Sequence, residues 1–411
     1  MKKIVAILMV LALVFCTFAA CSNKGDTTDD TTTTGAADTS STDYSKIKIG
    51  LICLHDENST YDNNFIQAMK EVQTELKLTD DQVLIKTNIP ESDACYTAAA
   101  ELADAGCNLI FADSFGHESY MLQAAKEFKD VQFCHATGTT AHTEKLDNFH
   151  NAFAAIYEGR FLAGVAAGMK LNEMIKDGKI TADKAKIGYV GAFPYAEVKS
   201  GYTSFFLGAR SVCESATMDV VYTNSWFDIA LEREAALNLI NSGCVLISQH
   251  ADSEGAPKAC EEKGVPNVAY NISTIPMGPN TALISSKIDW APYYKLAIDA
   301  VVKGTSIDAD YVGTFATGSV KLTELNEKVA AEGTQAKLDE VEAQLKAGTL
   351  HVFDTAKFTV GGKTLDSYMA DVDSDDKFTP DTEVVKDGFF HESEFRSAPY
   401  FDVIIDGITE K

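Results

Sequence analysis

From residue 46 onward, the chain alternates short apolar runs with segments of helical period. Apolar runs such as KIGLICL, NLIFADSF and VQFCHATG are separated by FIQAMKEVQTEL, YTAAAELADAG and SYMLQAAKEF. Strands that are buried on both faces form continuous apolar runs, and the amphipathic helices between them supply the cover. The alternation therefore predicts an α/β fold built on parallel sheets.

The same alternation restarts near residue 186. The runs KIGYVGAF, MDVVYTN, CVLISQHA and PNVAYNI alternate with SGYTSFFLGARSV, EREAALNLINSG and GAPKACEEKG. A chain of 411 residues, 45% of them hydrophobic, can bury more than one core. Two successive α/β series indicate two lobes, each with its own doubly wound parallel sheet, rather than one continuous sheet.

The N-terminus has the composition of a targeting segment. Lys2 and Lys3 precede the apolar run IVAILMVLALVF, and small residues follow it. The apolar run is too short to span a membrane comfortably, so the pattern predicts a secretory signal peptide over residues 1–20.

The segment after the signal peptide indicates an anchor and a tether. Cys21 directly follows an Ala-Ala pair, as in a bacterial lipobox, and we expect this cysteine to carry a lipid. The alternative is an ordinary secretory signal with an incidental cysteine. Residues 21–45 are polar and rich in Thr and Asp, which is typical of a flexible tether. We therefore expect an extracytoplasmic protein that is held at the cell membrane.

Charge and cysteine content exclude several classes of protein. With 35 Lys and Arg against 60 Asp and Glu, the chain has a formal net charge of −25, which repels phosphate backbones. Nucleic acid is therefore not an expected partner. No CxxC pair occurs, and several cysteines lie in apolar runs, where cysteine acts as a small hydrophobe. We expect no metal site, no disulfide framework and no cofactor.

No motif for catalysis is present. The patterns GxSxG, HExxH and GxGxxG do not occur, and GGKT at 361–364 lacks the first glycine of a phosphate loop, because Lys357 stands there. We therefore nominate no catalytic residue and expect a protein that is not an enzyme.

Polar and aromatic side chains follow the predicted strands of both series. In parallel α/β sheets, ligands bind beyond the carboxyl ends of the strands. Aromatic rings clamp a planar molecule there, while acids and amides bind its edge. The candidate ligand-binding residues are Tyr61, Asp62, Asn64, Phe65, Ser114, Phe115 and His117 in the first series, and Trp226, His250, Asp252 and Asn271 in the second.

Each candidate also has a structural alternative. Helix capping would explain Asp62, Ser114 and Asp252, because polar residues after strands commonly cap the next helix. Phe65 would serve as a core residue, and His117 and His250 would simply face solvent. Trp290, in DWAPYY, is expected to pack rather than bind. The recurrence of these residue types in both series favours the binding hypothesis.

Several longer segments carry a family resemblance. NAFAAIYEGRFLAGVAAGMK, KIGYVGAFPYAEVKSGYTSFFLGAR, TNSWFDIALEREAALNLINSGCVLISQHADSEGAPKACEEKGV and WAPYYKLAIDAVVKG together resemble the basic membrane protein (BMP) family of lipoproteins. The resemblance covers roughly residues 46–355. Members are substrate-binding components of ABC importers, and several bind purine nucleosides or free purines. The resemblance implies a type I periplasmic-binding-protein fold, with two lobes joined by three crossovers and a hinge that closes on the ligand.

The resemblance also implies domain boundaries. Residues 46–150 plus about 272–312 would form the first lobe, and residues 151–271 plus about 313–360 the second. Residues 361–411 would remain as an acidic C-terminal extension without an assigned role.

Site residues can be compared with the family in the same way. Asp62, Asn64 and Phe65 match the family's first-lobe turn, and the Ser114-Phe115 turn matches loosely. Nucleoside-binding members carry an Asp for the ribose hydroxyls where this chain has Asn271, and members often carry an amide or hydroxyl where it has Ile66. The SWFD and QHAD segments look more like the branch associated with free purine bases.

The leading hypothesis is a monomeric, lipid-anchored receptor that delivers a purine base or nucleoside to an ABC permease in the membrane. Tyr61, Phe65, Phe115 and Trp226 would stack on the ring, whereas Asp62, Ser114, Asp252 and Asn271 would read its donors and acceptors. A receptor of the same fold for a monosaccharide or another small polar solute is the first alternative. A surface nucleoside-processing enzyme and a ligand-sensing partner of a membrane receptor are the others.

Overall fold

The computed structural model describes residues 42–372 and 382–411, and residues 43–411 form one compact unit. The predicted signal peptide, Cys21 and most of the predicted tether lie outside the described residues. Among the helices that are described, none has the length and apolar character needed to cross a bilayer.

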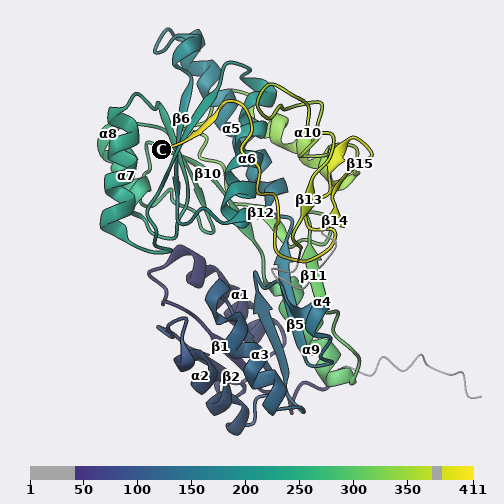
Figure 1. Cartoon of the computed structure of the whole chain (residues 1–411). Helices are drawn as coiled ribbons and strands as arrows, with labels where there is room; N and C mark the ends of the chain where they lie inside the picture. The colour runs from purple at the N-terminus through teal and green to yellow at the C-terminus, as the bar shows by residue number, and fades with distance from the viewer. Residues whose placement is uncertain (1–41, 373–381) are drawn as a thin grey trace, which may run out of the picture. The chain divides into compact units, whose positions relative to one another are not determined.

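The first lobe is built on a parallel sheet whose described strands run in the order β11-β5-β4-β3-β1-β2 (Figure 1). These strands are β1 (Ile49–Ile52), β2 (Val83–Lys86), β3 (Leu109–Ala112), β4 (Gln132–Ala136), β5 (Phe149–Ala154) and β11 (Asp310–Gly313). Helices α1 (Thr60–Glu75) and α9 (Ala291–Lys303) pack on one face, and α2 (Asp93–Asp104) and α3 (Glu118–Glu127) on the other. Short helices η1 (Asp80–Gln82), η2 (Phe115–His117) and α4 (Ala141–Glu144) lie in the connections.

The second lobe has a sheet with the order β12-β10-β9-β8-β6-β7-β17 over the described residues, in which only β12 is antiparallel to its neighbour. Its strands are β6 (Lys186–Gly191), β7 (Thr217–Tyr222), β8 (Leu246–His250), β9 (Asn267–Tyr270), β10 (Ala282–Ile288), β12 (Val320–Leu322) and β17 (Ile408–Glu410). Helices α5 (Ile156–Lys176) and α6 (Ala196–Val212) cover one face, and α7 (Ile229–Asn241) and α8 (Gly255–Lys263) cover the other. Helix α10 (Thr334–Lys346) packs on α5, and η3 (Ala182–Lys184) precedes β6.

Glycines allow α5 and α6 to approach closely. A Cβ atom added at Gly164 would lie 2.0 Å from the carbonyl oxygen of Phe205, and one at Gly208 would lie 2.0 Å from that of Phe161. Real Cβ atoms do not approach so near, so only glycine fits at these two contacts. This helix pair packs against the second-lobe sheet, whose strands carry site residues at their ends.

Within the described residues, the chain crosses between the lobes three times. The crossings follow β5, β10 and β11, which agrees with the expected type I periplasmic-binding-protein fold. Two predicted boundaries need correction. β5 keeps the chain in the first lobe up to Ala154 rather than 150, and β10 belongs to the second lobe, although residues from about 272 were predicted in the first.

The correction for β10 has a clear structural basis. β10 pairs with β9 in parallel, with Ser286 opposite Tyr270, and with β12 in antiparallel, with Ile288 opposite Val320. An apolar run of this kind suits either sheet, because both sheets are covered on two faces. Only the long-range pairing determines which lobe receives the strand.

The C-terminal extension is an integral part of the fold. β17 extends the second-lobe sheet by pairing with β7, with Ile408 opposite Met218. The backbone N–H of Ser397 donates to Asp310 Oδ1 of β11 at 2.8 Å, so the extension also contacts the first lobe. Its other described strands are β13 (Met369–Ala370), β14 (Thr382–Glu383), β15 (Val385–Lys386) and β16 (Phe389–Phe390), which form two antiparallel pairs.

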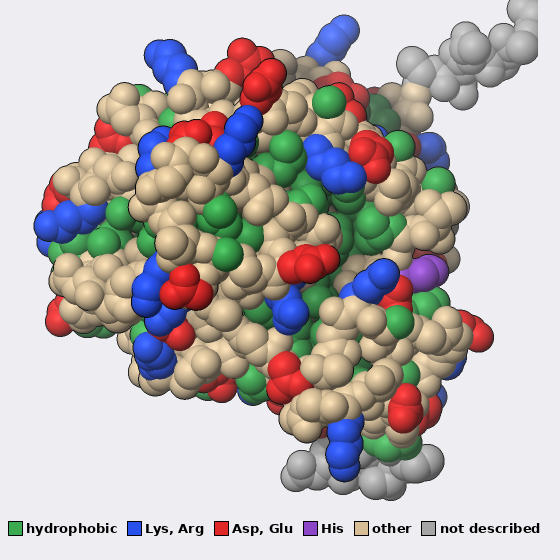
Figure 2. Space-filling model, turned by 90° about the horizontal axis from the view of Figure 1, so that it is seen from above, with side chains coloured by type: hydrophobic (Ala, Val, Ile, Leu, Met, Phe, Trp, Pro, Cys, Tyr) green, Lys and Arg blue, Asp and Glu red, His purple; other side chains and the backbone are tan. Residues whose placement is uncertain are grey.

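The surface shown in Figure 2 carries mixed charges. Lys and Arg side chains are interspersed with Asp and Glu over this face and do not gather into a stripe. A nucleic-acid-binding face would concentrate positive charge along one line or patch. This face therefore offers no track for a phosphate backbone.

Candidate ligand-binding site

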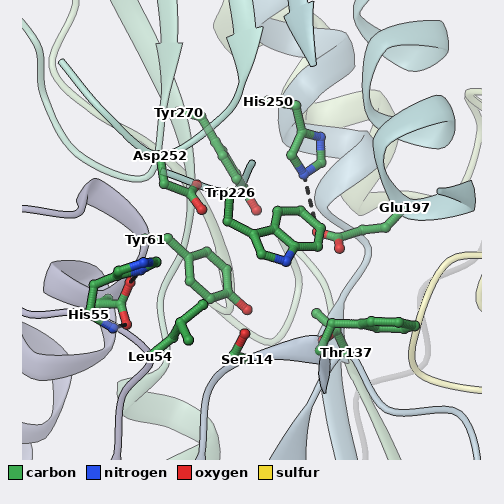
Figure 3. Close-up of a pocket in the computed structure, with 12 residues that line it drawn as sticks. Leu54, His55, Tyr61, Ser114, Thr137, Glu197, Trp226, His250, Asp252 and Tyr270 are labelled. Atoms are coloured by element: carbon green, nitrogen blue, oxygen red, sulfur yellow. Dashed lines mark hydrogen bonds and ion pairs between the residues drawn. The ribbon is translucent and has the colours of Figure 1, made fainter. Parts of the chain in front are cut away.

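A cavity lies between the two lobes, with about 360 Å³ of space that is not filled by protein atoms and that includes the part open to solvent (Figure 3). The first lobe contributes Leu54, His55, Tyr61, Asp62, Ser114, Phe115 and Thr137, and the second contributes Glu197, Trp226, His250, Asp252 and Tyr270. These residues lie at or just beyond the carboxyl ends of β1, β3, β4, β6, β7, β8 and β9. The cavity is therefore where ligands bind in parallel α/β sheets.

Most of the predicted binding residues come together in this cavity. Those that line it are Tyr61, Asp62, Ser114, Phe115, Trp226, His250 and Asp252. They come from both halves of the sequence, as the recurrence of aromatic and acidic residues after the strands predicted.

The predicted residue Phe65 does not line the cavity. Its ring is fully buried and stacks on Trp290, with ring centroids 4.3 Å apart and an interplanar angle of 24°. Tyr61 lies one helical turn earlier on the same side of α1, with its ring centroid 4.8 Å from that of Phe65. Tyr61 therefore reaches the cavity, and Phe65 lies one layer deeper in the core. Trp290 packs in this core, as expected from the sequence.

Three further candidates also have structural roles instead. The side-chain amide of Asn64 donates to the carbonyl oxygen of Ile288 at 2.6 Å, which ties α1 to the end of β10. His117 is fully buried against the carbonyl oxygen of Ile89, and burial lowers the pKa of His117 to about 4. Asn271 has a left-handed backbone with φ of 70° directly after Tyr270, and Tyr270 is the residue that lines the cavity.

Five lining residues were not among the predicted set. They are Leu54, His55, Thr137, Glu197 and Tyr270. His55 and Tyr270 end or follow apolar runs, so their positions in the sequence could have indicated them. Glu197 lies in the first turn of α6, where an acid also suits the helix dipole.

Thr137 has no comparable sequence signal. Its φ of 63° is rare for a β-branched residue, and the adjoining loop is held because Glu118 accepts from the backbone N–H groups of Thr139 and Thr140. Backbone conformations of this kind cluster at binding sites, where the surrounding structure enforces them.

Asp62 is held as an anion at the first-lobe side of the cavity. Its Oδ1 accepts from the backbone N–H of His55 at 2.8 Å, and its Oδ2 accepts from the hydroxyl of Ser59 at 2.6 Å. Burial alone would raise the pKa of Asp62, but the hydrogen bonds from His55 and Ser59 lower it below its ordinary value. Ser59 is the N-cap of α1, so the capping role considered for Asp62 belongs to its neighbour.

Ser114 and Asp252 are not side-chain caps either. The Ser114 hydroxyl donates to Glu91 Oε1 at 2.6 Å, which fixes the loop that carries Phe115. The N-cap residue of α8 is Glu254, beyond Asp252 in the sequence. The side chain of Asp252 is therefore free to line the cavity.

Glu197 and His250 are joined by a hydrogen bond on the second-lobe side. Glu197 Oε1 lies 3.2 Å from His250 Nε2, as the dashed line in Figure 3 marks. Burial and the nearby Arg160 lower the pKa of His250, although Glu197 acts in the opposite direction. None of the described residues that line the cavity is Lys or Arg, so the lining favours neutral or positively charged ligands over anions.

Aromatic rings from both lobes surround the cavity. Tyr61 of the first lobe and Trp226 of the second both lie near the centre of the view in Figure 3. At the mouth, Phe115 of the first lobe contacts Tyr195 of the second, with ring centroids 5.4 Å apart. Both rings at the mouth are about two-fifths exposed, at 40% and 42%, so they form its outer rim.

Three buried groups next to the cavity meet the distance criterion for a metal site. Ligand atoms of Cys53, Asp62 and Asp113 lie within 4.8 Å of one another. Burial and the neighbouring Asp62 raise the pKa of Asp113, and burial with nearby carboxylates raises the pKa of Cys53. Both shifts disfavour the deprotonated form that binds a cation, and the cluster is better explained as an acid pair that supports the loop at Leu54, whose N–H donates to Asp113 Oδ1.

Comparison with known families decides what kind of protein this is. The family described as "ABC transporter substrate-binding protein PnrA-like", or Bmp, matches residues 49–350. The chain belongs to the Bmp family. As a member, it is an extracytoplasmic substrate-binding protein that binds a small molecule and delivers it to an ABC permease. Bmp proteins are binding proteins, so the expectation that this chain is not an enzyme is confirmed and the nucleoside-processing alternative is set aside.

Individual relatives support the same assignment. A purine-binding protein of Brucella abortus is 32% identical over 311 residues, covering 75% of this chain and 83% of the relative. A putative ABC transporter glucose-binding protein of Haloferax volcanii is 35% identical over 233 residues, covering 56% of each chain. A solved solute-binding protein of Aeropyrum pernix has a TM-score of 0.62 at 16% identity, covering 75% of this Bmp protein and 93% of that chain. One of Conexibacter woesei has a TM-score of 0.60 at 20% identity, covering 74% and 98%. These two structures confirm the fold.

Proposed function

We propose that this Bmp protein captures a purine base between its lobes and delivers it to its permease. The observation that carries the proposal is the cavity itself, which is lined by Tyr61 and Trp226 from opposite lobes together with carboxyl groups. Aromatic faces stack on a flat heterocycle, and carboxyl groups bind the N–H donors at its edge. The Brucella abortus relative, which is named as a purine-binding protein, supports the same ligand class.

A free base suits this cavity better than a nucleoside. The cavity is small, and Phe115 and Tyr195 meet at its mouth. Asn271 stands at the position where nucleoside-binding members of the family carry an Asp. Asn271 does not line the cavity. A ribose would therefore need additional space and would lack its expected hydroxyl acceptor.

Anchoring and oligomeric state belong to the same proposal. Cys21 would carry a lipid that holds the protein at the outer side of the cell membrane, where the permease receives the ligand. The ligand cavity is lined within one chain, so a monomer suffices for capture. Metabolic labelling with a fatty acid, compared between the wild type and a Cys21→Ala variant, tests the anchor; equal labelling of both would contradict it.

A thermal-shift and calorimetric screen tests the ligand. The panel contains adenine, guanine, hypoxanthine, their nucleosides, glucose and ribose. A ligand that binds only the folded state adds RT ln(1 + [L]/Kd) to stability, roughly 2.7 kcal/mol at a hundredfold excess over Kd. We expect the free bases to produce the largest shift. A shift with a sugar and none with any purine would reject the proposal.

The panel includes sugars because a sugar is the second candidate ligand for this protein. The Haloferax volcanii relative is named as a putative glucose-binding protein, and aromatic rings with carboxyl groups also hold sugars. A sugar ring such as that of glucose is puckered and carries hydroxyl groups all around its rim, whereas a purine base is flat. Two aromatic rings in the lining, Tyr61 and Trp226, favour the flat ligand.

A further inference from the structure

The carboxyl group of Asp252 lies at the cavity without a protein hydrogen-bond donor. Asp252 is 5% exposed and lines the cavity. Its backbone N–H donates to the carbonyl oxygen of Trp226 at 2.9 Å, and its carbonyl oxygen accepts from the N–H of Thr60 at 2.8 Å. The main chain of Asp252 is therefore fixed on both sides, while no group in the described part of the chain is found to donate to its side chain. A buried carboxyl group without donors needs either a ligand or a proton.

Other acids surround this carboxyl group. Glu232 approaches from α7, Asp62 from α1 and Glu197 from the first turn of α6, and all three disfavour a negative charge on Asp252. Arg160 of α5 is positively charged and acts in the opposite direction. Burial and these carboxyl groups raise the pKa of Asp252 well above its ordinary value.

The other acids next to the cavity are already hydrogen-bonded. Asp62 accepts from His55 and Ser59, and Glu197 pairs with His250. Glu232 accepts from the backbone N–H of Ser253. Among the acids of this region, Asp252 is thus the one whose carboxyl oxygens are left for the ligand.

Tyr270 provides a second free polar group at the same place. The side chain is 1% exposed, and its hydroxyl has no hydrogen-bond partner among the described residues. The guanidinium carbon of Arg160 lies 3.6 Å from the centroid of the Tyr270 ring, which fixes the ring in a cation–π contact. Figure 3 shows the Tyr270 hydroxyl and the Asp252 carboxyl group both directed toward the space beside Tyr61.

We infer that Asp252 acts as a neutral carboxylic acid that pairs with a ligand edge on which an N–H donor adjoins a ring-nitrogen acceptor. This inference rests on the proposed function, because such edges are characteristic of purine bases. A neutral acid offers one O–H donor and one carbonyl acceptor side by side, which matches that edge with two hydrogen bonds. A carboxylate would instead match two adjacent N–H donors, as on the N1–N2 edge of guanine. Adenine, whose N–H groups all adjoin a ring nitrogen, is the ligand that this arrangement fits.

Substitution of Asp252 by Asn and by Ala tests whether Asp252 binds the ligand as a neutral acid rather than as a carboxylate. An amide also offers one donor beside one acceptor, so Asp252→Asn should bind adenine within about threefold of the wild type. Asp252→Ala leaves the edge of the ligand unpaired and should weaken adenine binding by roughly ten- to hundredfold. If Asp252→Asn binds adenine as weakly as Asp252→Ala does, while both variants remain folded, the neutral-acid role is overturned.

The pH dependence of the affinity provides an independent check. Calorimetric titration with adenine at a series of increasing pH values should show wild-type affinity falling as Asp252 ionises, because ionised Asp252 can no longer donate. Asp252→Asn is the matched control and should show a flatter profile. Wild-type affinity that rises with pH would overturn the inference. If no purine binds the wild type at any pH, the proposed function itself fails, which is a different result from purine binding with the wrong Asp252 profile.

Discussion

The backbone N–H of Thr60, at the start of α1 in the first lobe, donates a 2.8 Å hydrogen bond to the carbonyl oxygen of Asp252 in the second lobe. The side chain of Asp252 lines the cavity, so the same residue borders the proposed binding site and takes part in the contact between the lobes. The lobes therefore touch directly beside the site, as in the closed state of a hinged binding protein. A ligand that orders Asp252 would also stabilise this contact.

Removal of the Thr60 hydrogen bond should weaken closure without damaging α1. Thr60 is the first helical residue, where proline is well tolerated, and the extended backbone of Ser59 suits a residue that precedes proline. Thr60→Pro removes the N–H donor, so we expect ligand affinity to fall by roughly two- to tenfold, corresponding to about 0.5–1.5 kcal/mol. Thr60→Ala, which keeps the N–H, is the control. Equal affinities for both variants in calorimetry would show that the contact does not contribute.

Loss of the Trp226 ring should reduce binding of a flat ligand. Trp226 lines the cavity together with Tyr61 and is not part of the fully buried core. Base–aromatic stacking is worth roughly 1–3 kcal/mol per base, so Trp226→Ala should weaken adenine binding by about ten- to hundredfold. Titration calorimetry measures the loss, and a urea unfolding curve serves as the control for folding. Unchanged affinity would remove Trp226 from the site.

Loss of the Phe65 ring should instead reduce stability. Phe65 is fully buried against Trp290 and Phe111, with ring centroids 4.3 and 5.8 Å away. Phe65→Ala leaves a cavity in the first-lobe core and should lower the free energy of unfolding by about 3–5 kcal/mol. Chemical denaturation followed by circular dichroism gives this value. A stable Phe65→Ala variant that has lost only ligand binding would contradict the core assignment and favour the original prediction.

Buried Glu392 should make stability depend on pH. Its Oε1 accepts from the backbone N–H of Tyr400, but burial raises the pKa of Glu392 to about 8. The folded state therefore binds its proton more tightly than the unfolded state, and stability falls as pH rises from the ordinary glutamate value toward 8. One such group contributes a slope of up to about 1.4 kcal/mol per pH unit.

Denaturation of a Glu392→Gln variant at several pH values measures this slope. The amide keeps the acceptor for Tyr400 and does not titrate, so the fall in stability with pH should become shallower. Glu214→Gln, at an exposed position, is the matched control and should follow the wild type. A wild-type slope that persists in Glu392→Gln would assign the dependence to other groups.

The last strand should be required for a stable second lobe. Glu410 Oε1 accepts from the Tyr202 hydroxyl at 2.9 Å, and the N–H of Lys411 donates to the carbonyl oxygen of Val220. Deletion of residues 408–411 would expose β7 as a sheet edge and leave the mostly buried Tyr202 hydroxyl without its acceptor. We expect the unfolding free energy to drop by about 1–3 kcal/mol, with increased aggregation.

A variant can separate the strand from its side-chain contact. Glu410→Gln keeps an acceptor for Tyr202 together with all the backbone hydrogen bonds of β17, so its stability should remain close to that of the wild type. Light scattering and thermal unfolding compare the variant with the truncation. A truncated protein as stable as the wild type would show that β17 does not contribute to the stability of the second lobe.

The sequence predicted that the binding site lies at the carboxyl ends of the strands. Apolar runs locate the strands, and the polar residues that follow them must lie at the carboxyl edge of a parallel sheet. Tyr61, Trp226 and Asp252 could be found in this way. The same reasoning could not separate Tyr61 from Phe65, because the two aromatic residues are one helical turn apart and lie on the same side of α1.

Residues whose position depends on distant partners were not accessible to this reasoning. Glu118, far from Thr137 in the chain, holds the loop that brings Thr137 to the cavity in a left-handed conformation. Lobe assignment of β10 depended on its pairing with β9 and β12. The C-terminal extension gave no strong pattern, because a strand as short as β17 is defined mainly by its partner β7.

Local spacing in the sequence determined the α/β class, the two lobes and the set of residues at the strand ends, since helix and strand periods are properties of neighbouring residues. Tertiary structure alone decided that Trp290 covers Phe65, that β10 joins the second sheet and that Asp252 remains without a donor at the cavity. The physical reason is that burial, strand pairing and hydrogen-bond satisfaction depend on groups that folding brings together from distant parts of the chain.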